Sequence, residues 1–194
     1  QTCALPICGI NIGRVSAGAG NGFNGDFANY QLFTSMNAGS AIVNGWEFEY
    51  SQQFSSLPGL FRGLGVLSNF TILDTHGNYG GATTLSSSQV QNFVPHSGTA
   101  AVTYNFNGFN LRVGVNYTGV YLHANSTVAA SVLFREPRKV FNANLGYYLN
   151  KHVSVYCDLQ NFTAEPQLWY RGRHERPGDY NVNTSSINLG LTGR

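Results

Sequence analysis

The chain has 194 residues, of which 42% are hydrophobic, 13% aromatic and only 10% charged, and its formal net charge is +2. Charged residues make up roughly 25% of an ordinary soluble domain, so this composition argues against one. The sequence also lacks a basic stripe of the kind that binds nucleic acid, and it has no run near the ~18 apolar residues of a membrane-spanning helix.

The first residues are set apart from the fold. Gln1–Ile7 has the sequence QTCALPI and resembles a translated sequencing adapter, so we interpret residues 1–8 as an artefact and expect the true beginning of the protein to be missing. Residues 9–40 are rich in Gly, Asn and Ser, and we predict the end of a preceding strand and then a loop. Residues 20–25 match GxGxxG, but no strand precedes this pattern and no helix follows it, which favours a loop over a nucleotide site.

From residue 41 onward, apolar and polar residues alternate in segments long enough to be β-strands. The seven predicted strands are Ala41–Phe54, Gly63–Thr75, the two arms of Ser97–Tyr121, Val140–Leu149, Val153–Asn161 and Tyr180–Gly193. Each strand therefore presents one apolar and one polar face.

The central pair, Ser97–Tyr121, is the clearest hairpin. Its arms meet at Asn107-Gly108, a dipeptide that suits a tight turn because both turn positions need positive φ. On the apolar face, aromatic residues such as Tyr104 and Tyr117 stand near the ends and aliphatic residues lie between them. This arrangement suits a bilayer, so we predict a hairpin of a transmembrane β-barrel.

Connections and charges point the same way. Short turns near residues 55–62, 107–108 and 150–151 alternate with long loops at 76–96, 122–137 and 162–179, which is typical of an outer-membrane barrel with its short turns on the periplasmic side. Four charged residues lie opposite the apolar faces and are predicted to face the lumen: Glu47, Glu49, Arg112 and Asp158. An arginine in contact with lipid would cost roughly 2–4 kcal/mol.

The sequence thus predicts an all-β fold. We expect an antiparallel meander of about seven long strands that forms an open part of a transmembrane β-barrel, residues 41–194. Such a piece would be a curved open sheet with two unpaired edges rather than a closed pore.

Candidate ligand contacts lie in the third long loop. Trp169, Tyr170, Arg171 and Arg173 could contact an anionic ligand at the extracellular mouth, and the alternative is an aromatic girdle beside a solvated basic loop. The same basic cluster continues through His174, Glu175 and Arg176.

No metal site, cofactor or catalytic group is predicted. The histidines all fall in loops or at strand ends, and neither they nor the cysteines have a metal-ligand spacing. The histidines are His76, His96, His123, His152 and His174, and the cysteines are Cys3, Cys8 and Cys157. No grouping of Ser, His and Asp indicates an enzyme.

Two stretches resemble a known family, the C-terminal barrel portion of TonB-dependent outer-membrane receptors. The first is NAGSAIVNGWEFEYSQQF followed by LPGLFRGLGVLSNFTILDT, and the second is DLQNFTAEPQLWYRG, which is similar to an "NLTNEP" stretch near the C-terminus of the family. The resemblance covers about Asn37–Arg194. It does not indicate a substrate.

The resemblance implies a plugged barrel of about 22 strands in a bacterial outer membrane. Such a receptor contacts outer-membrane lipid and imports a scarce small molecule or oligosaccharide, such as a siderophore or cobalamin, driven by the TonB–ExbB–ExbD complex. Two departures matter. The plug and TonB box that would carry energy coupling are absent from this sequence, and Gly193-Arg194 is not the terminal aromatic expected of an assembly signal.

Two other functions remain open at this stage. A passive porin-like barrel would have the same alternation without a plug. A soluble β-sandwich, such as a carbohydrate-binding module, would pack its apolar faces as a core, and the sparse charge argues against it.

Overall fold

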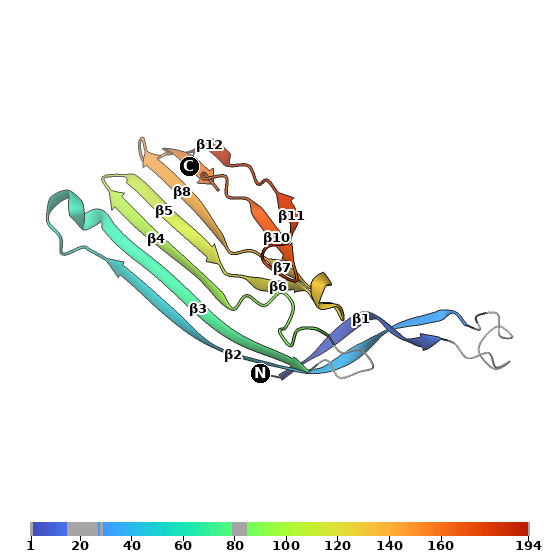
Figure 1. Cartoon of the computed structure of the whole chain (residues 1–194). Coiled ribbons are helices and arrows are strands. Elements are labelled where there is room, and N and C mark those ends of the chain that lie inside the picture. Colours follow the sequence, from blue (N-terminus) through green and yellow to red (C-terminus); the bar gives the residue numbers. More distant parts are fainter. Residues whose placement is uncertain (1, 15–26, 28, 79–84, 194) are drawn as a thin grey trace.

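In the part of the chain that the structure describes, the strands form a large antiparallel sheet of eight and a small sheet of four (Figure 1). The computed structural model describes residues 2–14, 27, 29–78 and 85–193. In order, the large sheet contains β1 (Thr2–Arg14), β2 (Gln31–Gln53), β3 (Leu64–Asn78), β4 (His96–Phe106), β5 (Phe109–Thr118), β8 (Arg138–Tyr148), β9 (Val153–Gln160) and β12 (Ser186–Gly193). The small sheet contains β11 (Pro177–Asn181), β10 (Gln167–Arg171), β7 (Leu133–Arg135) and β6 (Tyr121–Ala124).

Within the described residues the large sheet is open, because β1 and β12 each pair on one side only. This confirms the predicted all-β meander and its open edges. The short 3-10 helices η2 (Gly59–Gly63) and η3 (Ala129–Ser131) lie in connections. Among the described residues, no helix is long and apolar enough to cross a membrane.

Alternation along each strand produces one continuous apolar face. A single row crosses six strands, with each residue directly opposite the next: Val66, Val102, Val113, Ala143, Leu159 and Ile187. Large apolar side chains on this face are exposed, including Trp46 at 73% and Leu189 at 75%. An apolar surface of this extent is not a packed core and suits contact with lipid.

On the opposite face of the large sheet, polar residues of neighbouring strands lie directly opposite one another. The neighbouring row runs Thr103, Arg112, Asn144, Asp158 and Asn188. The Asn144 amide donates a 2.8 Å hydrogen bond to the Asp158 carboxylate. Glu47 and Glu49 lie on the same face, opposite Thr71 and Asn69 of β3.

The central hairpin turns as its sequence predicts. Asn107 and Gly108 have φ values of 49° and 78°, and Phe106 lies directly opposite Phe109. Positive φ at both turn positions matches the right-handed twist of the two strands. Because consecutive strands are antiparallel, the short connections share one end of the sheet and the long ones share the other.

The structure departs from the predicted strands at both ends. β1 ends at Arg14, in the range where the end of a preceding strand is predicted, and it pairs with β2 through an irregular register. β2 begins at Gln31 rather than Ala41, within the range predicted as a loop. The last strand begins at Ser186 rather than Tyr180, because Pro177–Asn181 pairs with β10 instead. The GxGxxG pattern at residues 20–25 lies outside the described residues. The adapter origin of residues 1–8 stays a prediction.

The long loops are not structureless, which corrects the prediction for residues 122–137 and 162–179. Parts of both pair with each other as the small sheet at the long-loop end (Figure 1). Four of the six buried apolar residues among those described lie in the loops and the small sheet: Leu122 at 1%, Val90 at 3%, Val132 at 3% and Tyr121 at 8% exposure. The other two are small residues of the large sheet, Ala41 at 2% and Ala101 at 5%. The main core among the described residues therefore lies between loops, while large apolar side chains of the large sheet, such as Trp46 and Leu189, are exposed.

Residues 85–95 join the two sheets. Toward β3, the amides of Gly77 and Leu73 donate to the carbonyls of Ser88 and Pro95 at 2.7 Å each. Toward β6, the Asn92 amide donates to the Leu122 carbonyl at 2.8 Å. This connection thus satisfies backbone groups on both of its sides and fixes the small sheet to the large one.

Asn161 organises the connection after β9. It is 7% exposed, has φ of 48°, and donates its side-chain amide to the carbonyls of Glu165 and Asn183 at 3.2 Å each. Its side-chain oxygen accepts a 3.0 Å bond from the Glu165 amide, and its own backbone amide donates to the Asn142 side chain at 3.0 Å. One buried side chain therefore holds the start of the β9–β10 connection and the segment before β12.

Replacing Val113 tests the apolar face. Val113→Arg should lower the free energy of unfolding by roughly 2–4 kcal/mol, because the charge would contact lipid near the middle of the strand. Asn188→Arg is the matched control on the polar face, where Asp158 lies opposite. Denaturant unfolding of the protein in lipid vesicles measures both. Equal losses would contradict the assignment of faces.

Replacing Asn161 tests the buried hub. Asn161→Ala should destabilise the protein by about 1–3 kcal/mol, because buried partners lose their hydrogen bonds. Asn161→Gly tolerates the positive φ and isolates the hydrogen-bond part of that loss. The same unfolding assay compares the variants. Wild-type stability in both would show that Asn161 does not hold the two segments together.

Candidate ligand-binding site

The small sheet places the candidate aromatic residues on its two faces. On one face, Arg135 of β7 lies directly opposite both Tyr121 of β6 and Trp169 of β10. Its guanidinium carbon is 5.7 Å from the centre of the Tyr121 ring and 5.5 Å from that of Trp169, and its Nη1 donates a 2.7 Å hydrogen bond to the Tyr121 hydroxyl. Trp169 is therefore engaged by a cation within the sheet.

On the other face, Tyr170 stacks on Phe134. The ring centres are 5.1 Å apart and the planes differ by 14°. The His174 ring lies 5.5 Å from Tyr170, and His174 Nε2 is 3.0 Å from Glu136 Oε1. Burial, and then the nearby Glu136 carboxylate, raise the pKa of Tyr170 above its ordinary value. The phenol therefore stays neutral to a higher pH than a free tyrosine.

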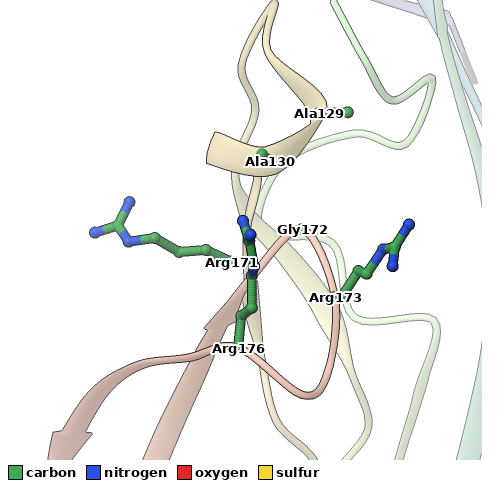
Figure 2. A pocket seen from close by; sticks show the side chains of 6 residues that line it. All are labelled: Ala129, Ala130, Arg171, Gly172, Arg173 and Arg176. Carbon is green, nitrogen blue, oxygen red and sulfur yellow. The ribbon is translucent and has the colours of Figure 1, made fainter.

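The turn between β10 and β11 carries three exposed arginines. We call Arg171, Gly172, Arg173 and Arg176 the arginine turn. With Ala129 and Ala130 of η3 it lines a hollow of about 460 Å³ (Figure 2). Gly172 has φ of +68°, and a Cβ there would lie 3.0 Å from the Ala129 carbonyl oxygen, so another residue would strain the backbone and crowd η3.

The arginine side chains of the turn point apart. Arg171 and Arg173 extend in opposite directions, and Arg176 extends between them (Figure 2). Arg171 has one carboxylate nearby, Asp179 at 3.9 Å, but both side chains are more than half exposed, so this ion pair contributes little. The turn therefore presents positive charge to solvent.

Its backbone is well held despite this exposure. The Arg171 amide donates to the Arg176 carbonyl at 3.1 Å, and the Gly172 amide donates to the Val132 carbonyl at 2.8 Å. The second bond ties the turn to the chain just before β7.

A second hollow of about 380 Å³ lies on the polar face of the large sheet, nearer the short turns. Arg112 and Asp158 line it together with Asn110, Asn144 and Tyr156. Glu47 and Glu49 do not line this hollow, although they lie on the same face. The sheet thus brings two of the four predicted lumen charges to one place.

Residues 11–162 match the family model described as TonB dependent receptor-like, beta-barrel. The chain belongs to this family. No curated protein matches it in sequence.

Among solved structures, the chain is similar to the siderophore receptor PiuA from Acinetobacter baumannii, with a TM-score of 0.58 and 15% sequence identity. The match covers 82% of this chain and 23% of that receptor, so the chain spans less than a quarter of the length of the receptor that it resembles. At this identity the likeness concerns the fold alone.

For this receptor barrel, the sequence predicts the basic cluster that forms the arginine turn but not the residues that hold this turn in place. Arg176 belongs to the basic cluster of the third long loop but is not one of the four predicted contacts. No sequence pattern indicates that Arg135 and Glu136 support the turn, because their contacts are with residues on or next to β6 and β10, which are distant in sequence. Part of the Trp169 ring is covered by Arg135, and part of the Tyr170 ring is covered by Phe134.

In the described part of the receptor barrel the histidines lie apart from one another. Those with a side-chain contact each have different partners. His76 lies 3.5 Å from Asp74, His96 lies against Phe70, and His123 Nδ1 is 3.1 Å from the Asn92 side-chain oxygen. Across residues 2–14, 27, 29–78 and 85–193, no group of three or more His, Cys, Asp or Glu side chains could hold a metal ion.

Removing the Glu136 charge tests the electrostatics around Tyr170. Glu136→Gln should lower the pKa of Tyr170, because the nearby negative charge no longer disfavours the phenolate. The raised pKa in the folded state contributes stability below the ordinary tyrosine pKa, and this contribution is lost as the pH rises through the raised value.

Ultraviolet difference titration of the full-length receptor, referenced to Tyr170→Phe, measures this pKa. Glu175→Gln, an exposed carboxylate of the same turn, is the control and should change it little. An unchanged titration in Glu136→Gln would show that this carboxylate does not act on Tyr170.

Proposed function

We propose that this chain is part of a bacterial outer-membrane receptor that imports a scarce nutrient, such as a siderophore, cobalamin or an oligosaccharide, in steps driven by TonB–ExbB–ExbD. The main support is the family match over residues 11–162, together with the continuous apolar face opposed by a charged polar face. The protein acts by binding and transport and has no enzymatic activity.

In this proposal the two faces of the large sheet have different roles. The apolar face contacts outer-membrane lipid. Glu47, Glu49, Arg112 and Asp158 face the wet interior, where charge need not be removed from water. The long-loop end, which carries the small sheet, faces the outside of the cell.

The ligand contacts proposed for this chain lie in the small sheet and its turn. Arg171, Arg173 and Arg176 supply exposed guanidinium groups for an anionic ligand. Trp169 and Tyr170 are partly exposed, and the parts of their rings outside the stacks can contact the same ligand.

Energy coupling is the first test of this function. The full-length receptor is produced in cells with and without TonB, and uptake is measured for a panel of ferric siderophores, cobalamin and oligosaccharides. Uptake of at least one compound should require TonB. Equal uptake without TonB would replace this proposal with a passive porin-like barrel.

Charge removal tests the proposed contacts. Arg171→Gln, Arg173→Gln and Arg176→Gln together should weaken binding of an anionic substrate at least tenfold, because a charge-assisted hydrogen bond contributes about 1.5–3 kcal/mol. Arg62→Gln is the control, since Arg62 is an exposed arginine in η2 at the opposite end of the sheet, above the Phe106 ring. Direct binding to the purified receptor is measured for both. Equal affinity in the two variants would exclude the arginine turn as a contact.

A further inference from the structure

The strand β7 is short, yet β7 and the residue after it make several side-chain and backbone contacts with β10 and its turn. Consecutive residues do this: Phe134 stacks on Tyr170, Arg135 lies against Trp169, and Glu136 just after the strand pairs with His174. In the backbone, the Glu136 amide donates to the Leu168 carbonyl at 2.9 Å.

Arg135 is the residue through which three strands meet. Its side chain is partly buried between the rings of Tyr121 on β6 and Trp169 on β10, with a hydrogen bond to the Tyr121 hydroxyl. Tyr121 is itself only 8% exposed and adjoins Leu122, the most buried side chain among the described residues. Arg135 thus connects β10 to the fixed core between the loops.

Backbone pairing by itself gives this small sheet little stability. Three residues of β7 pair with β10, and the pairing of β7 with β6 and of β10 with β11 contains register shifts. Strands this short are marginal without side-chain contacts. A planar cation between two rings supplies contacts that lysine cannot reproduce, because an ammonium group neither stacks flat nor reaches both rings while donating to the hydroxyl.

We propose that Arg135 is a positioning residue, which fixes β10 against β6 and β7 and thereby sets the place of the arginine turn. Only the assignment of that turn to ligand binding rests on the proposed function. The positioning of β10 by Arg135 is independent of any ligand.

Hydrogen exchange of the full-length receptor in lipid nanodiscs tests this role. In Arg135→Met, amides of residues 167–176 should exchange about tenfold faster than in the wild type, because two ring contacts and one hydrogen bond are lost. Arg135→Lys should give nearly the same acceleration, and Tyr121→Phe, which keeps the ring but removes the hydroxyl, a smaller one. Peptides from β4 and β5 should be unchanged throughout.

A spectroscopic signature separates positioning from a general loss of stability. Loosening β10 admits water around Tyr170, so its pKa should fall toward the ordinary value in Arg135→Met while the large sheet keeps its protection. Trp169→Leu removes the other half of the contact and should reproduce both changes.

Arg173→Met is the matched control, an exposed arginine in the same turn, and should leave exchange and titration unchanged. If Arg135→Met leaves residues 167–176 as protected as in the wild type, or if lysine restores full protection, the proposal is overturned. Faster exchange that spreads to β4 and β5 also overturns it. Neither readout uses a ligand, so failure of the uptake experiment leaves this test valid, and the reverse also holds.

Discussion

The fold depends on one constraint, that each strand of the large sheet must satisfy its backbone groups through its neighbours while meeting lipid on one face and water on the other. A strand can do this only if apolar and polar residues alternate, since a shift of one residue would exchange its two faces. The row from Val66 to Ile187 and the adjoining row through Arg112 and Asp158 show this condition met in register.

The long loops obey the same requirement by another route. Outside the bilayer their backbone groups could bond to water, yet many pair with each other as β6, β7, β10 and β11. Residues 85–95 then bond to β3 on one side and to β6 on the other. The loops consequently form a folded layer at the end of the sheet, with the buried Leu122 at its centre.

Within that layer, some side chains hold the strands together and others are exposed to solvent. The side chains of Arg135, Glu136 and Phe134 are directed at other protein groups, whereas the arginines of the turn are exposed to solvent. Exposed charges on a held backbone can bind an anion without a large loss of conformational freedom. This division makes the arginine turn a better candidate contact than the stacked rings of Trp169 and Tyr170.

The sequence by itself determined the properties that depend on neighbouring residues. Period-two alternation determined the two faces, including the placement of Arg112 and Asp158 opposite the apolar residues, and Asn107-Gly108 determined the central turn. Tertiary structure decided the small sheet, the start of β2 at Gln31 and the role of Arg135. Strands of three to five residues are too short to show a period, and their partners lie far away in the chain, so only the folded arrangement brings their contacts together.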